Sequence, residues 1–226
     1  MGCLGYADDI LLLSGSRTGL QVMVDMCGKF AKEKNLKFST DSNPVKSKTK
    51  CIVFSKSSRD RLHVAPVHLN SDPLPWVTQV KHLGNVLQSD NSMKIDCTLK
   101  RGRFIGKTNS LLQEFHFVKK EVLMKILNIY TTSFYGSGLW DLYSREVDRL
   151  YKAWNVTIRK ALSIPNTTHR YLIEPLSGCI HPKVMLASRL TKFRDTIRNS
   201  NSGGLLTPAT SKKNLKYCLS GESLLY

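Results

Sequence analysis

Two short apolar runs open the chain, at residues 3–6 and 10–13, and a charged pair, Asp8 and Asp9, lies between them. Runs of this length, flanked by glycines, favour a β-hairpin with the aspartates at its turn. A carboxylate buried without a partner is costly, and two adjacent ones cost more. The predicted hairpin therefore needs a chemical reason to carry two carboxylates among apolar residues.

The apolar spacing then becomes helical, because residues 20–31 repeat every three or four positions. Ser16 or Thr18 is in place to cap this helix. Residues 36–39 and 51–54 are short strand candidates. The loop between these two strands is polar, contains a proline and is rich in lysine.

A second hairpin is predicted over residues 65–77, around the turn signal Asn70–Pro73. The run QVKHLGNVL at residues 79–87 follows, with Gly84 expected at a bulge or a close backbone approach. From about residue 92 the period is helical. The predicted helices cover residues 93–115, 119–135, 144–163, which Pro165 ends, and 181–198.

These elements predict an α+β chain with its strands and helices segregated. Residues 1–90 form a small half of short antiparallel hairpins with a helix, and residues 91–200 form a helical half. Residues 201–226 look irregular and basic, with a glycine pair and a serine-rich stretch.

The charge of the chain changes this picture most, because 34 Lys and Arg against 17 Asp and Glu give a net charge of +17. A domain this basic is typical of proteins that meet polyanions, since clustered cations release counterions from phosphates. A solubilising surface is the alternative. No apolar run has the length that crosses a bilayer, and no signal peptide is visible. We therefore expect an intracellular protein, cytoplasmic or nuclear, without a membrane partner.

The six cysteines show no metal-site or redox spacing, so free thiols in a reducing compartment are expected. Paired aspartates at a strand turn suit a hard cation instead. Mg²⁺ (or Mn²⁺) takes oxygen ligands and leaves positions for substrate phosphates. A plain acidic turn is the alternative reading of Asp8 and Asp9, because two adjacent aspartates at a turn are common.

The order of motifs along the chain resembles the reverse transcriptases of non-LTR (LINE-type) retrotransposons. YADD between apolar strands is similar to their catalytic hairpin, and a helix, NPVKSKTKCIVF, VKHLGNVL and a basic helical region with YGSGLW follow in the family's order. The resemblance covers most of residues 3–165. It implies an RNA-directed DNA polymerase, a nucleotidyltransferase that uses an RNA template, a DNA primer and deoxynucleotides.

This resemblance implies roles for individual residues of the first half, which would be the C-terminal part of a polymerase palm. Asp8 and Asp9 would bind the catalytic metals, and Tyr6 would touch the primer end or the template–primer minor groove. The lysine loop would supply a general acid toward pyrophosphate. Spacing to the following strand favours Lys48 for this role, whereas an asparagine-based alignment favours Lys46, and Lys50 stays open.

The resemblance also implies that VKHLGNVL is the primer grip, with His82, Leu83 and Gly84 against the primer strand. His82 stands where the family often has an aromatic residue, and a partly buried structural histidine is its alternative. The helical half would be the thumb, and eight bases against three acids between residues 94 and 125 suit a duplex backbone. Its expected template–primer contacts are Lys100, Arg101, Arg103 and Lys107. The aromatic residues expected in the core of this half are Tyr130, Phe134, Tyr135, Trp140 and Trp154.

The resemblance leaves two parts without a counterpart. A polymerase palm uses a third carboxylate on a strand that precedes the YADD hairpin, and it uses fingers that bind the nucleotide. We expect both upstream of residue 1, on a missing N-terminal palm and fingers chain, so the metal site is expected to be incomplete and this fragment inactive. The expected hairpin then carries an exposed apolar edge, which predicts poor solubility or a need for another chain. The alternative function is a non-catalytic, basic nucleic-acid-binding module.

Overall fold

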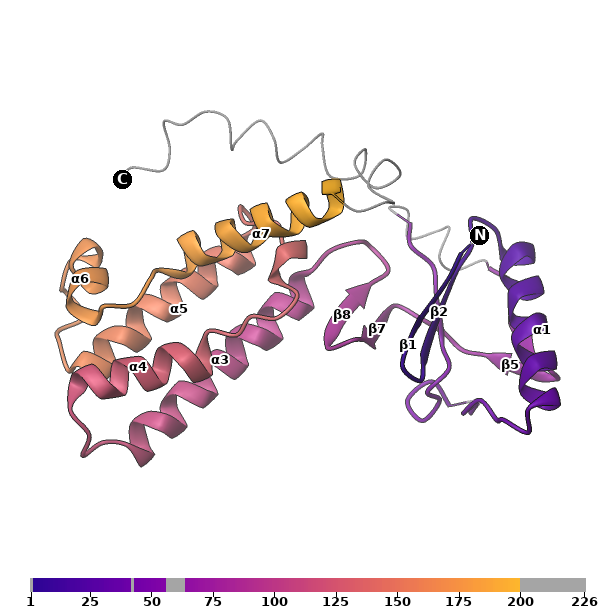
Figure 1. Cartoon of the computed structure of the whole chain (residues 1–226), viewed down its shortest axis with the longest axis horizontal. Helices are drawn as coiled ribbons and strands as arrows, with labels where there is room; N and C mark the ends of the chain where they lie inside the picture. Colours follow the sequence, from indigo (N-terminus) through magenta and orange to yellow (C-terminus); the bar gives the residue numbers. More distant parts are fainter. Residues whose placement is uncertain (1, 42, 56–63, 200–226) are drawn as a thin grey trace. The chain divides into compact units, whose positions relative to one another are not determined.

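The structure is a computed structural model that describes residues 2–41, 43–55 and 64–199 (Figure 1). Its helices and short strands make the chain a mixed α+β protein, as the sequence predicts. The chain divides into one unit that extends to Ile95 and a second that begins at Asp96, close to the expected division after residue 90. The irregular tail expected over residues 201–226 lies outside the described residues.

The first unit opens with the predicted hairpin. Strands β1 (Gly2–Tyr6) and β2 (Asp9–Leu13) pair antiparallel, with Tyr6 opposite Asp9, so the turn holds only two residues. Leu12 packs against the core of this unit, whereas Leu4 on the opposite face is 59% exposed. The hairpin prediction is confirmed, and one apolar face of the hairpin meets solvent.

Helix α1 (Arg17–Glu33) follows the hairpin and covers part of it. Its first turn is closed by the Ser16 side chain, which accepts a hydrogen bond of 3.1 Å from the Gly19 N–H. A serine that satisfies a free N–H group in this way stabilises a helix start. Of the two candidate caps, Ser16 is therefore the one that the structure uses.

In the part of this unit that the structure describes, the remaining strands form three further sheets of two strands each. They are β3 (Cys51–Ile52) parallel to β6 (Trp76–Val77), β4 (Val67–Leu69) antiparallel to β5 (Asp72–Leu74), and β7 (Gln79–His82) antiparallel to β8 (Asn85–Gln88). The strand predicted at residues 36–39 is wrong. A backbone hydrogen bond from Thr49 N–H reaches Ser39 O there, but no ladder forms, and Phe38 instead packs against the core.

The core of the first unit is small, and α1 and the short sheets share it. Its buried members are Val24, Cys51, Val67, Leu69 and Leu74, with Leu12, Leu20, Phe38 and Trp76 partly buried against them. Two-stranded sheets bury little on their own, so this cluster depends on the single helix for cover.

The second unit is helical. It begins within the first turn of α3. Its elements are α3 (Lys94–Glu114), α4 (Lys120–Thr131), the 3₁₀ turn η1 (Ser137–Leu139), α5 (Arg145–Leu162), the 3₁₀ turn η2 (Arg170–Leu172), α6 (Ile173–Ser177) and α7 (Pro182–Asn199). All four predicted helices are confirmed. Their core is tightly covered, and its largest buried side chains include Leu127, Trp140, Leu150, Trp154, Ile173 and Leu186.

Two of these helices end earlier than their hydrophobic pattern predicts. Helix α4 ends at Thr131 because the chain turns through Phe134 and Gly136, which have φ of 30° and 76°. Helix α5 ends at Leu162, where Ser163 adopts a left-handed φ of 59° and closes the last turn. A left-handed residue stops a helix as effectively as the proline that follows, so Pro165 is not what ends α5.

Candidate functional site

The turn of the first hairpin consists of Ala7 and Asp8, with Asp9 as the first residue of β2. Ala7 has a φ of 52°, in the left-handed region that residues with a Cβ adopt at a cost of about 1–3 kcal/mol. Strained turns of this kind cluster at functional sites. The turn places Asp8 and Asp9 at the exposed tip of the hairpin.

Both carboxylates lie in solvent, and this position corrects the sequence argument that they carry a burial cost. Asp9 pairs across the strands with Tyr6, so their side chains share one face of the hairpin. The Tyr6 side chain is 68% exposed. The structure therefore brings Tyr6, Asp8 and Asp9 together on one open tip.

Two adjacent exposed carboxylates fit a hard cation only as part of a ligand set. Mg²⁺ is commonly held by one or two carboxylates together with water and substrate phosphates, and Asp8 and Asp9 match that donor set. Among residues 2–41, 43–55 and 64–199, no group of three or more His, Cys, Asp or Glu side chains is placed to hold a metal. The tip offers two oxygen-donor side chains to such an ion.

The lysine loop is held by short local hydrogen bonds. Asp41 Oδ1 accepts from the Asn43 N–H at 2.7 Å, and the Ser47 hydroxyl, which is buried, donates to Thr49 O at 2.6 Å. Lys48, the residue after Ser47, is exposed. Lys46 is exposed as well and Lys50 is half-buried, so the choice among the three lysines stays open.

The proposed primer grip is the β7–β8 hairpin. Its two turn residues, Leu83 and Gly84, both have positive φ, of 44° and 78°. This signature belongs to a type I′ turn, which suits the twist of antiparallel strands. Gly84 thus lies in the turn and not at a bulge, while His82 is half-buried beside it. The hairpins β1–β2 and β7–β8 belong to separate sheets.

The basic residues of α3 divide into two groups. Arg103 and Lys107 are exposed one helical turn apart, and Arg101 is half-buried. The template–primer contact predicted for Lys100 is not supported, because its side chain is buried and its Nζ lies 2.8 Å from Asp96 Oδ2. The Lys100 ammonium is therefore committed to the interior of the second unit and is not available to a phosphate.

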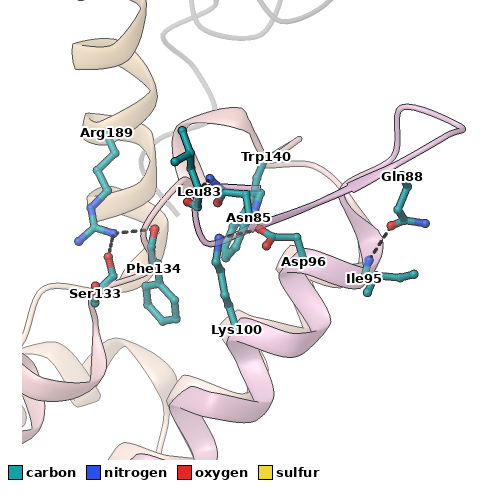
Figure 2. A network of polar contacts seen from close by, with 10 residues as sticks. All are labelled: Leu83, Asn85, Gln88, Ile95, Asp96, Lys100, Ser133, Phe134, Trp140 and Arg189. Atoms are coloured by element: carbon teal, nitrogen blue, oxygen red, sulfur yellow. Dashed lines mark hydrogen bonds and ion pairs between the residues drawn. The ribbon is translucent and has the colours of Figure 1, made fainter. Parts of the chain in front are cut away.

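Asp96 holds a polar network that the sequence argument missed (Figure 2). Its Oδ2 also accepts a hydrogen bond of 2.9 Å from the Trp140 indole N–H, and Lys100 Nζ lies 5.7 Å from the centroid of that ring. The feature of the sequence that could have indicated this network is the four-residue spacing of Asp96 and Lys100 within an amphipathic helix. Hydrogen bonds to both partners make a buried charge tolerable.

Arg189 of α7 is a second residue with an unpredicted role. Its guanidinium donates to the carbonyls of Thr132, Ser133 and Phe134, which follow the end of α4 (Figure 2). Burial lowers the pKa of Arg189. The cation therefore supplies hydrogen bonds to carbonyl groups that a helix end leaves free.

The predicted aromatic core of the second unit is confirmed for Phe134, Trp140 and Trp154, which are each at most 5% exposed. It is wrong for Tyr130 and Tyr135, which are 61% and 63% exposed. Tyr130 falls on the outer side of α4, and Tyr135 lies in the turn that ends it. Their hydroxyl groups reach water there, so exposure costs less than it would for Phe.

The five described cysteines are free thiols. In the part of the chain that the structure describes, no helix is both long enough and apolar enough to cross a membrane. Comparisons with protein-family models, curated proteins and solved structures find no match to this chain.

Proposed function

We propose that this chain is the C-terminal palm and thumb portion of a reverse transcriptase of the non-LTR retrotransposon type. The observation that carries the proposal is the tip of the first hairpin, where a two-residue turn with a left-handed Ala7 holds Asp8 and Asp9 in solvent. A strained turn that exposes adjacent carboxylates favours metal binding over a merely structural role.

The proposed chemistry is nucleotidyl transfer in the intact parent enzyme. Asp8 and Asp9 would hold Mg²⁺ or Mn²⁺. The bound ion would stabilise the negative charge on the phosphoryl oxygens. Tyr6, on the same face as Asp9, would contact the end of the primer strand. Lys48 would donate a proton toward pyrophosphate from its exposed position in the lysine loop.

The template–primer duplex is the proposed partner of three further elements. The type I′ turn of the β7–β8 hairpin, with His82, Leu83 and Gly84, would support the primer backbone. Arg103 and Lys107 would contact phosphates from the exposed side of α3, and Arg101 would add a partly exposed charge. Phosphate contacts of this kind position a duplex without reading its sequence.

We expect this chain alone to extend no primer, because two carboxylates make an incomplete two-metal site. Primer extension on an RNA template with Mg²⁺ tests this expectation directly. Robust extension by the isolated chain would contradict it.

Metal binding separates the proposed site from a plain acidic turn. Binding of Mn²⁺ to the whole chain, followed by electron paramagnetic resonance, should be lost in the double variant Asp8→Asn with Asp9→Asn. Asp195→Asn, an exposed carboxylate on α7, is the matched control and should leave binding unchanged. Equal Mn²⁺ binding by the double variant and the wild type would remove the metal from the proposal.

A non-catalytic nucleic-acid-binding module is the second candidate function. The exposed basic side chains of α3 favour it independently of the hairpin. In that case duplex affinity falls steeply with salt and does not depend on Asp8 or Asp9. Absence of duplex binding at low salt would exclude this function. Loss of duplex affinity in the Asp8→Asn, Asp9→Asn variant with Mg²⁺ present would favour the polymerase reading.

A further inference from the structure

An exposed aromatic pair lies between α5 and α6, at the start of the 3₁₀ turn η2. The rings of His169 and Tyr171 are stacked, with centroids 5.5 Å apart and 25° between the ring planes. Tyr171 is 70% exposed, and His169 is also exposed. Aromatic rings contribute to stability mainly by burial, so a pair in solvent adds little to this fold.

The backbone beneath the pair is held in place from both sides. Arg159 of α5 donates two hydrogen bonds to the carbonyl of Thr168, from Nε at 3.1 Å and from Nη2 at 2.7 Å. The Leu172 N–H donates to His169 O at 3.1 Å and closes η2. Ile173, the next residue, is fully buried. A surface fixed in this way loses little conformational entropy when a ligand binds.

The surroundings of the pair are positively charged. Arg170 lies between the two aromatic residues in the sequence and is exposed, and Lys183, the second residue of α7, is exposed as well. Burial lowers the pKa of His181, and the charges of Lys183 and Arg170 lower it further against the opposing effect of Glu174. Both cations therefore lie close to one histidine, which packs against Tyr151 and Trp154.

Acidic side chains are scarce in the same stretch of sequence. From Arg149 to Arg194 the chain has nine Lys or Arg residues and one acid, Glu174. The Glu174 carboxylate is engaged, since its Oε1 accepts a hydrogen bond of 2.6 Å from the His181 N–H. The excess of positive charge in this stretch of sequence thus favours an anionic ligand.

We propose that His169 and Tyr171 form a stacking platform for the unpaired bases of a single-stranded nucleic acid, with Arg170 and Lys183 beside its phosphates. Every nucleobase has a π-face, so such a platform binds single strands with little sequence preference. A positive surface with exposed rings fits this ligand. Leu172, Leu176 and Ile180 of the same stretch of sequence also expose apolar side chains, so a protein partner is the competing outcome of the test. The site does not depend on Asp8, Asp9 or a polymerase origin.

Fluorescence anisotropy of a labelled oligouridylate with the whole chain tests the platform. The measurement belongs at about 0.2 M salt, where binding by charge alone is weakened. Tyr171→Leu should bind about tenfold more weakly, because one stacked base is lost. Tyr171→Phe keeps the ring and should bind like the wild type. Tyr135→Leu changes a tyrosine of similar exposure away from the platform and should have no effect.

An abasic strand of the same length separates stacking from charge, because it keeps the phosphates and lacks the bases. The wild type and Tyr171→Leu should bind this strand equally, whereas Arg170→Gln should weaken binding to both strands. Two results would overturn the proposal: unchanged binding of oligouridylate by Tyr171→Leu, or an equal loss on the abasic strand. The first is also the result expected if the rings serve a protein partner.

Discussion

The two units of this chain bury their apolar residues in different ways. The unit that extends to Ile95 has a core of five buried side chains under one helix, and each of its described sheets has only two strands. The unit that begins at Asp96 buries two tryptophans, Trp140 and Trp154, to 2% and 1% exposure. The contrast separates a sparsely covered β-rich part from a well-packed helical part.

The difference follows from where each element finds its hydrogen bonds. A helix satisfies its backbone internally and needs a partner for one face only. A strand needs neighbours on both edges as well as cover for its faces, and within the described residues β1 and β2 pair only with each other. Any further strand that pairs with β1–β2 would therefore stabilise the first unit more than the second.

The two tryptophans of different burial give the largest test of this comparison. Trp154→Ala removes a fully buried ring that packs against His181, and we expect a loss of about 3–5 kcal/mol in the free energy of unfolding. Trp76→Ala removes a half-buried ring from the first unit and should cost about 1–2 kcal/mol. Urea titration followed by circular dichroism measures both losses. Equal losses would contradict the contrast between the units.

Two ion pairs of equal length and spacing test burial within the helical unit. Asp96–Lys100 is buried and Asp148–Lys152 is exposed, and both have 2.8 Å between nitrogen and oxygen. Asp96→Ala leaves a buried ammonium without its carboxylate and should cost about 3–5 kcal/mol. Asp148→Ala should cost less than about 1 kcal/mol. Thermal unfolding of the two variants checks this, and a similar effect would mean that Asp96 is more hydrated than its burial indicates.

One arginine in each unit donates to backbone carbonyls, and replacing each of them tests the comparison with smaller expected losses of stability. Arg189→Met keeps the apolar stem but removes hydrogen bonds to three carbonyls after α4, and should cost about 1–3 kcal/mol. Arg17→Met in the first unit removes one exposed hydrogen bond to Pro66 O and should cost less than about 0.5 kcal/mol. The midpoints of urea unfolding measure both effects, provided that the dependence of the free energy of unfolding on urea concentration is the same in each variant. A larger loss for Arg17→Met would show that the first unit depends on that contact.

The exposed face of the first hairpin gives the smallest expected change in stability. Leu4 and Leu13 are 59% and 44% exposed, so Leu4→Thr with Leu13→Thr should change the free energy of unfolding by about 0.5 kcal/mol or less. The same double variant should raise the concentration of soluble protein, because it removes an exposed apolar surface. Sedimentation of concentrated samples measures this. Unchanged solubility would mean that this face does not drive self-association.

Local patterns in the sequence were sufficient to predict the YADD hairpin and every long helix, and they narrowed the cap of α1 to Ser16 or Thr18, whereas the short helix α6 was not predicted. Each depends on residues close in sequence: apolar spacing for α5, and a short polar turn between apolar runs for β1–β2. The strand at residues 36–39 was wrong because its pairing depends on a distant partner. For Gly84 the sequence predicted a bulge or a close backbone approach, whereas the structure places this residue in a type I′ turn.

The site was less predictable, because it depends on which face each residue takes. A basic helix predicts phosphate contacts, yet Lys100 faces inward to Asp96 while Arg103 and Lys107 face outward. The hydrogen bonds from Arg189 to three carbonyls after α4 join residues more than fifty positions apart, and no local pattern marks them. The roles of Asp8, Asp9 and Lys48 stay predictions that the experiments above decide.

The burial of the cysteines has a practical consequence for labelling chemistry. Burial raises the pKa of the Cys51 and Cys97 thiols to about 11, and it also raises the pKa of Cys27 and Cys179. The thiolate is the form that reacts with maleimides, and at neutral pH a thiol with such a pKa has about one thiolate in ten thousand. Cys3 is exposed on β1. Among the described cysteines, Cys3 is therefore the natural attachment point for a spectroscopic probe on the strand that leads into the YADD turn.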